Sequence, residues 1–168
     1  MIEIREEQPD DIAAIRDVNT RAFGQDQEAR IVDRLRQNGA ARLSLVATLR
    51  DRVVGHIMYS PIAVGESIVG AALGPMAVLP EHQGQGIGSM LVRAGTARLE
   101  EAGCPCILVI GHPAFYPRFG FTPARAQGIT CEWDVPDDVF MVLVLDPLKM
   151  QGITGLARYR EEFSTAVS

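Results

Sequence analysis

A glycine-rich turn is the part of the sequence best suited to bind a charged ligand. It reads Pro80-Glu81-His82-Gln83-Gly84-Gln85-Gly86-Ile87-Gly88-Ser89 and lies between an apolar run and a stretch with helical spacing. Because glycine has no Cβ, backbone N–H groups in such a turn can come close to a ligand. The first amides of a helix have no partner within the helix and carry partial positive charge. The turn therefore predicts an anion site of the kind that holds a pyrophosphate.

Two other phosphate-binding loops differ from this turn in spacing. The dinucleotide fingerprint G-x-G-x-x-G, started at Gly84, requires a third glycine where this chain has Ser89. The P-loop G-x-x-x-x-G-K-[ST] requires a lysine that does not follow here. For the turn taken alone, a tight strand-to-helix connection without any ligand is the structural alternative.

The remaining reactive side chains do not form a second motif. His56, His82 and His112 are far apart, with no paired ligands at helical spacing, so no metal site is expected. The chain has three cysteines, an odd number without a loop-rich framework, and we expect reduced thiols rather than disulfides. No Gly-x-Ser-x-Gly elbow supports a serine hydrolase.

Hydrophobic spacing predicts the elements that must hold the turn in place. A first helix is expected to open at Pro9-Asp10-Asp11 and to include Ile12, Ile15, Val18 and Phe23, and further helices are expected at about 27–37 and 86–102. Strands are expected at about 2–4, 43–49, 53–64, 69–79, 107–110 and 139–145, with Asp51-Arg52 turning a hairpin between the second and third. The tail at about 153–163 fits either a strand or an amphipathic helix. This order predicts a mixed α/β sheet with helices on both faces.

Length and composition are those of one globular domain, and we expect a single domain over residues 1–168. The formal net charge of −5 argues against nucleic acid as a partner, since phosphate binding needs Lys and Arg. No apolar stretch reaches the length of about 18 residues that a membrane span needs, and the N-terminus does not resemble a signal peptide. We therefore expect a cytoplasmic protein without membrane contact.

Gln83-x-x-Gly86-x-Gly88 resembles the acyl-CoA pyrophosphate loop of the GCN5-related N-acetyltransferases (GNAT), whose pattern is Gln/Arg-x-x-Gly-x-Gly/Ala. The preceding Met76-Ala77-Val78-Leu79-Pro80-Glu81 is similar to the strand that leads into that loop in the family. The resemblance implies a GNAT-like fold with a mostly antiparallel twisted sheet, and acetyl-CoA as cosubstrate without a metal. It implies a cofactor site formed by Met76, Ala77, Val78, Gln83, Gly84, Gln85, Gly86, Ile87, Gly88 and Ser89.

A second landmark, Tyr116-Pro117-Arg118-Phe119-Gly120-Phe121, resembles the Tyr-x-x-x-Gly-Phe segment of the same family. Gly111-His112-Pro113 precedes it, as in one bacterial subgroup. Two motifs in the family's order are much more specific than either alone. The resemblance is strong over about fifty residues, from Leu73 to Phe121, and extends to the rest of the chain through the order of elements.

The resemblance implies direct transfer of an acetyl group from CoA to an amine, without an acyl-enzyme. The amide of Ala77 or Val78 would stabilise the oxyanion, and Tyr116 would protonate the CoA sulfur. Many relatives carry a carboxylate near the end of the fourth or fifth strand, but the run that resembles the fifth strand here, 107–110, has no acid. His112, Glu81 or water could take the proton instead; a turn-holding role is the alternative for His112, and aromatic packing for Tyr116.

The acceptor is not identified by any motif. We expect a small-molecule or peptide amine to be recognised by the loops 22–30 and 122–138, where Asp134, Asp137 and Asp138 could attract a cation. Two other functions stay open: a regulatory module that binds acyl-CoA without turnover, and a structural protein without a CoA site. A homodimer is possible, as in relatives.

Overall fold

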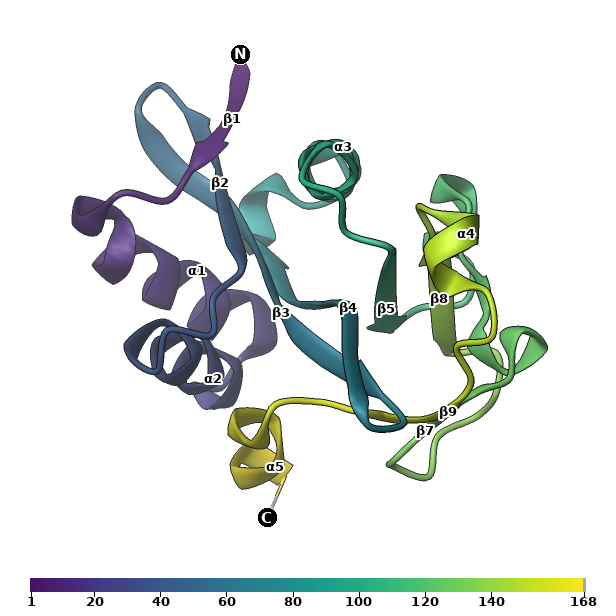
Figure 1. Ribbon diagram of the computed structural model, residues 1–168. Helices are drawn as coiled ribbons and strands as arrows, with labels where there is room; N and C mark the ends of the chain where they lie inside the picture. The colour runs from purple at the N-terminus through teal and green to yellow at the C-terminus, as the bar shows by residue number, and fades with distance from the viewer. Residues whose placement is uncertain (168) are drawn as a thin grey trace. The chain divides into compact units, whose positions relative to one another are not determined.

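The structure is a computed structural model that describes residues 1–167, apart from the side chains of residues 68 and 165–167. The chain forms two compact units, each described here by itself (Figure 1). The first unit comprises Met1–Ser60, Gly74–Gly95 and the segment from Glu161, and the second comprises Pro61–Leu73 and Thr96–Arg160. That the whole chain is one domain stays a prediction.

The first unit contains an antiparallel sheet and its helices. Strands β1 (Ile2–Glu6), β2 (Leu43–Leu49) and β3 (Arg52–Val64) pair in this order, with Ile4 opposite Ala47 and Val46 opposite His56. The end of β4 (Ser67–Val78) lies next to β3 in the sheet order. The helices of this unit are η1 (Pro9–Asp11), α1 (Ile12–Phe23), α2 (Gln27–Gln37), η2 (Pro80–His82), the first part of α3 (Ile87–Glu101), and α5 (Glu161–Val167).

Helices cover both faces of the sheet in the first unit, and two neighbouring residues of β3 show why. Successive side chains of a strand point to opposite faces. Gly55 faces α3, where a Cβ would lie 3.1 Å from Ile87 and 3.2 Å from Leu91. His56 faces the other side and contacts Asn19 of α1. Figure 1 shows α1 and α2 on one side of β2 and β3, and α3 on the other.

The hairpin between β2 and β3 turns one residue earlier than the sequence predicted. Its central residues are Arg50 and Asp51, with φ values of 51° and 63°. Two left-handed residues in succession are typical of the tight hairpin turn that matches strand twist, and this turn usually contains Asn or Gly. The expected Asp51-Arg52 turn was wrong because neither residue marks the position, and Arg52 already begins β3.

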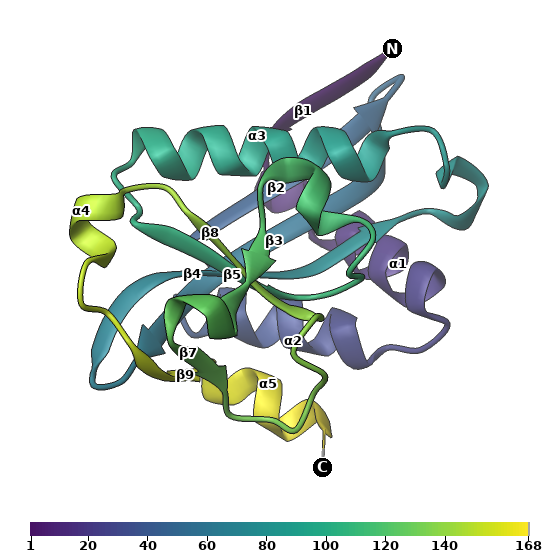
Figure 2. The same ribbon diagram turned by 90° about the vertical axis from the view of Figure 1, so that its right-hand side faces the viewer.

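The second unit has a mixed sheet. The first part of β4 pairs in parallel with β5 (Cys106–Ile110), with Ala71 opposite Ile107, and β5 pairs antiparallel with β8 (Phe140–Val144). Strand β6 (Thr122–Pro123) pairs with β8, and β7 (Ile129–Cys131) pairs in parallel with β9 (Gly155–Arg158). Figures 1 and 2 both show β7 and β9 side by side. Three short helices complete it: η3 (Tyr116–Phe119), η4 (Ala124–Gln127) and α4 (Pro147–Met150).

The core of the second unit draws on every one of its strands except β6, whose two residues are exposed. Its buried members are Ile62, Val64, Ala72, Cys106, Leu108, Ala124, Ile129, Phe140, Val142 and Ala157. Residues 122–138, expected as a variable loop, contain β6, η4 and β7, which the sequence did not indicate. The ambiguous tail resolves into both alternatives in succession, β9 and then α5. The predicted mixed α/β class with a mostly antiparallel sheet is confirmed.

Candidate functional site

The glycine-rich turn of the first unit leads from β4 through η2 into α3. Gly84 and Gly86 have φ values of 76° and 85°, in the left-handed region that favours glycine. A Cβ added at either position would meet no atom within 4 Å, so the space around these two glycines is open. Helix α3 begins at Ile87, and the amides of its first turn lack partners within the helix. The turn thus has the conformation and the free surface of an anion site.

Two contacts of its side chains fix this turn to the rest of the first unit. Gln83 Nε2 donates to the carbonyl oxygen of Val78 at 3.0 Å, which ties the turn back to the end of β4. Glu81 accepts from Arg21 Nη2 of α1 at 2.8 Å. A hydrogen bond from its own backbone amide, together with Arg21, lowers the pKa of the Glu81 carboxyl. A carboxylate held in this way is a weaker base than an unpaired one.

The predicted cofactor-binding residues differ in what they can offer a ligand. The side chains of Gln83 and Gln85 are exposed, as are Gly84 and Gly86, and Gly88 is half-buried. Ile87 and Ser89 are buried, so their side chains are not presented at the surface. In β4, Ala77 is buried while Met76 and Val78 are half-buried. The glycines of the turn can therefore offer a ligand only backbone groups, whereas Gln83 and Gln85 can also offer their side chains.

Tyr116, in the second unit, begins the short helix η3 and is 7% exposed. Its ring makes edge contacts with Phe115 and Phe121, at centroid distances of 5.0 and 5.6 Å. Burial raises the pKa of the Tyr116 hydroxyl to about 12. The phenol therefore keeps its proton at neutral pH, and its aromatic neighbours hold the ring in one orientation.

His112 follows β5 and holds the turn that precedes Tyr116. Its Nδ1 accepts a hydrogen bond from the amide of Ala114 at 3.2 Å, and its carbonyl oxygen accepts one from the amide of Phe115 at 3.1 Å. With Nδ1 as acceptor, a neutral imidazole carries its proton on Nε2. His112 can take up a proton only after the contact to Ala114 is lost, so its base role stays a prediction.

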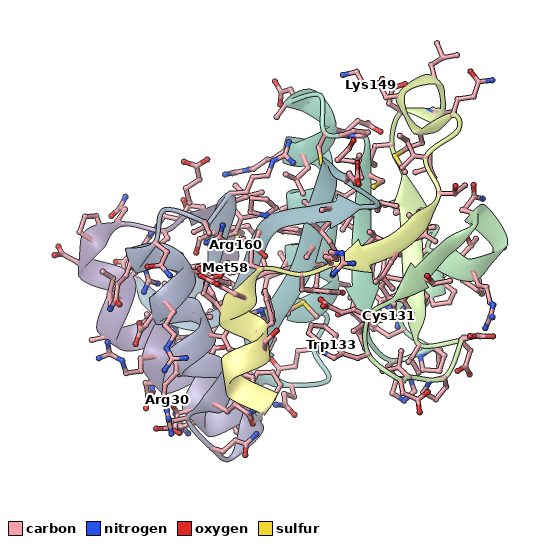
Figure 3. All side chains as sticks on the ribbon, turned by 60° about the horizontal axis from the view of Figure 1, so that its bottom comes forward. Arg30, Met58, Cys131, Trp133, Lys149 and Arg160 are labelled. Atoms are coloured by element: carbon pink, nitrogen blue, oxygen red, sulfur yellow. The ribbon has the colours of Figure 1, made fainter. Side chains whose placement is uncertain are left out.

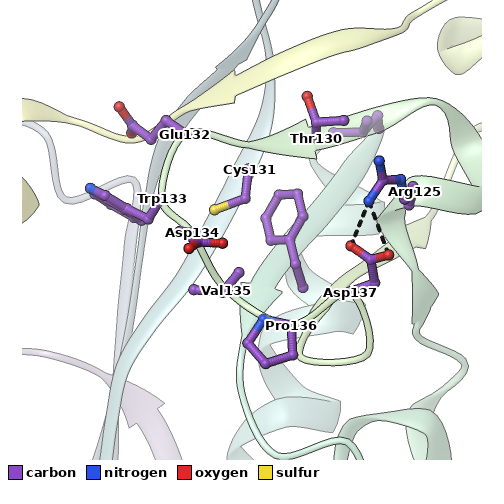
Figure 4. A pocket seen from close by; sticks show the side chains of 11 residues that line it. Arg125, Thr130, Cys131, Glu132, Trp133, Asp134, Val135, Pro136 and Asp137 are labelled. Atoms are coloured by element: carbon purple, nitrogen blue, oxygen red, sulfur yellow. Dashed lines mark hydrogen bonds and ion pairs between the residues drawn. The ribbon is translucent and has the colours of Figure 1, made fainter.

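A pocket of about 430 Å³ lies within the second unit, between Arg125 and Phe140, and we call it the 125–140 pocket (Figure 4). The sequence had singled out three acids of this segment. Asp134 and Asp137 line the pocket, and Asp138 is not among its lining residues. Asp137 is paired with Arg125, whose Nη1 lies 2.9 and 3.0 Å from the two carboxylate oxygens.

The sequence did not indicate a buried polar network in the first unit. Asn19 Nδ2 donates to Nδ1 of His56 at 3.2 Å, and the other ring nitrogen contacts Ser44 Oγ at 2.9 Å. Ser44 donates in turn to Glu7 at 2.7 Å, and Arg36 binds both oxygens of Glu7. Burial lowers the pKa of His56 to about 3, so the ring is neutral at pH 7. No periodicity marks these residues, because they come from five different segments of the chain.

Within residues 1–167, no three His, Cys, Asp or Glu side chains are grouped so that they could hold a metal ion. Cys104 and Cys106 are buried and Cys131 is half-buried, and all three are free thiols. Figure 3 shows Cys131 and Trp133 together at the end of β7. No helix of the described chain is long and apolar enough to cross a membrane.

Comparison with known proteins identifies the class of protein to which this fold belongs. A family model described as an acetyltransferase (GNAT) domain matches residues 40–123, which include both the glycine-rich turn and Tyr116. YhbS of Escherichia coli K12, described as an uncharacterized N-acetyltransferase, is 37% identical over 163 residues, covering 96% of this chain and 98% of YhbS.

Two crystal structures extend the likeness to three dimensions. YhbS of E. coli in complex with CoA has a TM-score of 0.92 and 36% identity, covering 97% of this chain and 92% of that one. A GNAT-family acetyltransferase from Brucella melitensis in complex with acetyl-CoA has a TM-score of 0.83 and 36% identity, covering 97% and 98%. The protein is thus an acyltransferase by class. The chain belongs to the GNAT family, which confirms the predicted family and fold.

Proposed function

We propose that this chain moves the acetyl group of acetyl-CoA directly to a primary amine. The observation that carries the proposal is the turn from Gln83 to Ser89, with left-handed Gly84 and Gly86, open space around them, and a helix beginning at Ile87. A pyrophosphate is stabilised where free amides and the helix dipole face it. Support also comes from the two similar crystal structures, which hold CoA and acetyl-CoA.

In this proposal the backbone of β4 holds the acetyl-bearing arm. The polar groups of Met76, Ala77 and Val78 would bind the pantetheine, and an amide of Ala77 or Val78 would stabilise the oxyanion. The amine nitrogen attacks the thioester carbon, the C–N bond forms, and the C–S bond breaks. The amine gives up a proton and the departing sulfur gains one.

Tyr116 supplies the proton to the sulfur. Its high pKa keeps the phenol protonated, and a thiolate with an ordinary thiol pKa of about 8.5 gains most from a donor while negative charge develops. His112 is the proposed proton acceptor, after its contact with Ala114 is released. Glu81 is less suited to that role because Arg21 already neutralises it. Water is the other acceptor of the proton.

The acceptor is proposed to be a small-molecule or peptide amine, and the location the cytoplasm, in line with the acetyl-CoA chemistry. A homodimer is a further proposal that the measurement of molecular mass in solution would test. The alternative function is a regulatory module of the same fold that binds acyl-CoA with weak or no turnover. The absence of an acidic residue in β5 favours that alternative, whereas the buried, oriented Tyr116 favours the enzyme.

Thermal unfolding with and without acetyl-CoA tests the proposal, with NADH and ATP as controls. A ligand at about 100 times its Kd adds roughly 2.7 kcal/mol to the free energy of unfolding, which raises Tm by several degrees. We expect a shift with acetyl-CoA alone, followed by thiol release when amines are added. Stabilisation by acetyl-CoA without release of the CoA thiol when any amine is added would favour the regulatory module. The absence of stabilisation would contradict the proposed CoA site.

A further inference from the structure

The 125–140 pocket offers two kinds of surface to a ligand. Its apolar side consists of the half-buried Trp133 and Val135, and the buried Phe140. The Trp133 ring is held in place by Tyr159, at a centroid distance of 4.8 Å. A volume of about 430 Å³ falls within the range of small-molecule sites.

The three acids that line the pocket differ in their partners among the described residues. Asp137 is neutralised by Arg125 on one side of the pocket, and Trp133 lies on the other (Figure 4). Glu132 accepts a hydrogen bond from the amide of Tyr159 at 2.8 Å. Asp134 lines the pocket, is exposed, and makes no hydrogen bond or ion pair with any other described residue.

Apart from the three acids, the described lining residues include one thiol and one cationic side chain. Cys131 lines the pocket, and burial raises the pKa of its thiol, so that the sulfur is neutral at pH 7. The only cationic side chain among the described lining residues is Arg125, which is held by Asp137. An aromatic face next to a free carboxylate favours a cation, because both attract positive charge.

We propose that the 125–140 pocket binds the acceptor as a small ammonium compound with an apolar body, its charge at Asp134 and its carbon skeleton against Trp133. The bound ammonium gives up one proton, to His112 or to water as in the proposed function, before its nitrogen attacks the thioester carbon. This inference rests on the proposed function. The pocket shows which ligand chemistry fits, and the proposed function makes that ligand the acceptor. The acceptor class is then a hydrophobic amine, and neither an anionic amino acid nor a neutral sugar.

Trp133 is the only tryptophan of the chain, so tryptophan fluorescence, excited at a wavelength that tyrosine does not absorb, reports on this pocket. The full-length protein is titrated with cyclohexylmethylamine and with cyclohexylmethanol, which share the same apolar body and differ in charge. We expect saturable binding of the amine and about tenfold weaker binding of the alcohol. Equal binding of the two probes, or no fluorescence response to the amine, would overturn the proposal.

Asp134→Asn and Asp138→Asn form a matched pair, since both are exposed acids of the same segment and only Asp134 lines the pocket. Asp134→Asn should weaken amine binding to the level of the alcohol, and Asp138→Asn should leave it unchanged. An equal loss of amine affinity in both variants would mean that the amine responds to the overall negative charge of the segment, which would contradict the proposal. Thermal unfolding of both variants checks that they fold.

Kinetics separate this inference from the proposed function. With cyclohexylmethylamine as acceptor, Asp134→Asn should raise the KM for the amine about tenfold, with kcat and the acetyl-CoA thermal shift unchanged. Equal KM values in Asp134→Asn and the unaltered protein would overturn the acceptor assignment while the proposed function stands. Binding of the amine in the fluorescence titration, without a Tm shift on addition of acetyl-CoA, would instead contradict the proposed function. The pocket's ligand could then no longer be identified as an acceptor.

Discussion

Gly111 and Tyr116 pack so closely that the first must be glycine. A Cβ added at Gly111 would overlap Cε2 of the Tyr116 ring. The backbone cannot move away easily, because the Gly111 amide donates to the carbonyl oxygen of Val139 at 2.9 Å. Gly111, which follows β5, therefore sets the position of Tyr116, the proposed general acid. The close packing of the Tyr116 ring explains why the Gly111-His112-Pro113 stretch begins with glycine.

Gly111→Ala should destabilise the protein and displace Tyr116. Forcing a methyl group into a packed site costs about 1–3 kcal/mol, and turnover should fall because the phenol moves. The measurement is the free energy of unfolding of Gly111→Ala, of Tyr116→Ala and of the double variant. Because Tyr116→Ala removes the ring, Gly111→Ala should cost much less in that background. Additive losses would show that the clash is with something else.

Tyr116→Phe should lower kcat by about 10²-fold or more, the usual contribution of a general acid, with little change in acetyl-CoA affinity. The aromatic contacts with Phe115 and Phe121 survive this change, so the ring stays in place. Tyr59→Phe is the control, since Tyr59 is a fully buried tyrosine of the first unit without a proposed catalytic role. Unaltered kcat in Tyr116→Phe would mean that Tyr116 only packs, and would favour water as the proton donor.

His112→Asn distinguishes the two roles of this residue. An asparagine Oδ1 can accept the Ala114 amide in place of Nδ1, but asparagine does not titrate. If His112 is the base, both Asn and Ala variants should lose activity and the acidic limb of the pH–rate profile. If His112 only holds the turn, Asn should keep activity and Ala should lose it together with a few degrees of Tm.

Family and fold could be predicted from the sequence because they depend on local patterns. The spacing of Gln83, Gly86 and Gly88 indicates a local backbone conformation, and a positive φ such as that of Gly86 favours glycine. The apolar run 107–110 indicates a buried strand for the same kind of local reason.

Features that depend on contacts between distant residues could not be predicted. Nothing near Asp137 in the sequence shows that Arg125 neutralises it while Asp134 stays free. The Ala114 contact of His112 depends on the path of a turn, and the His56 network joins segments as far apart as Glu7 and His56. In each case the chemistry of a side chain is decided by a neighbour that sequence spacing does not reveal.

Gly86→Ala should weaken acetyl-CoA binding by more than its backbone strain explains. Alanine at a left-handed position costs about 1 kcal/mol of stability through backbone strain. No clash adds to this cost at Gly86, because no atom lies within 4 Å of an added Cβ. Gly24→Ala is a matched control: its φ is 71°, no atom lies within 4 Å of its added Cβ, and it ends α1 rather than the turn. Both variants should lose similar Tm without ligand. Only Gly86→Ala should lose the acetyl-CoA shift, and an equal shift in both would exclude close approach of the ligand at Gly86.

The buried His56 should make the protein less stable in acid. In the folded chain its pKa is lowered from 6.5 to about 3 by burial, so between these values the unfolded chain binds a proton that the folded one does not. The free energy of unfolding should therefore fall as pH drops from about 6.5 towards 3, by up to about 1.4 kcal/mol per pH unit. Glu7 adds to this loss at the acidic end. Burial would raise its pKa, but hydrogen bonds from Arg36 and Ser44 lower it overall.

Urea unfolding of the unaltered protein and of His56→Gln at several pH values measures this contribution. Glutamine keeps a donor and an acceptor for Asn19 and Ser44 but binds no proton, so the variant should start less stable at pH 7 and lose less as the pH falls. His82→Gln, in the turn after β4, should change neither value. Parallel pH dependence of the unaltered protein and His56→Gln would contradict the assignment, because the acid sensitivity would then belong to carboxylates such as Glu7 alone.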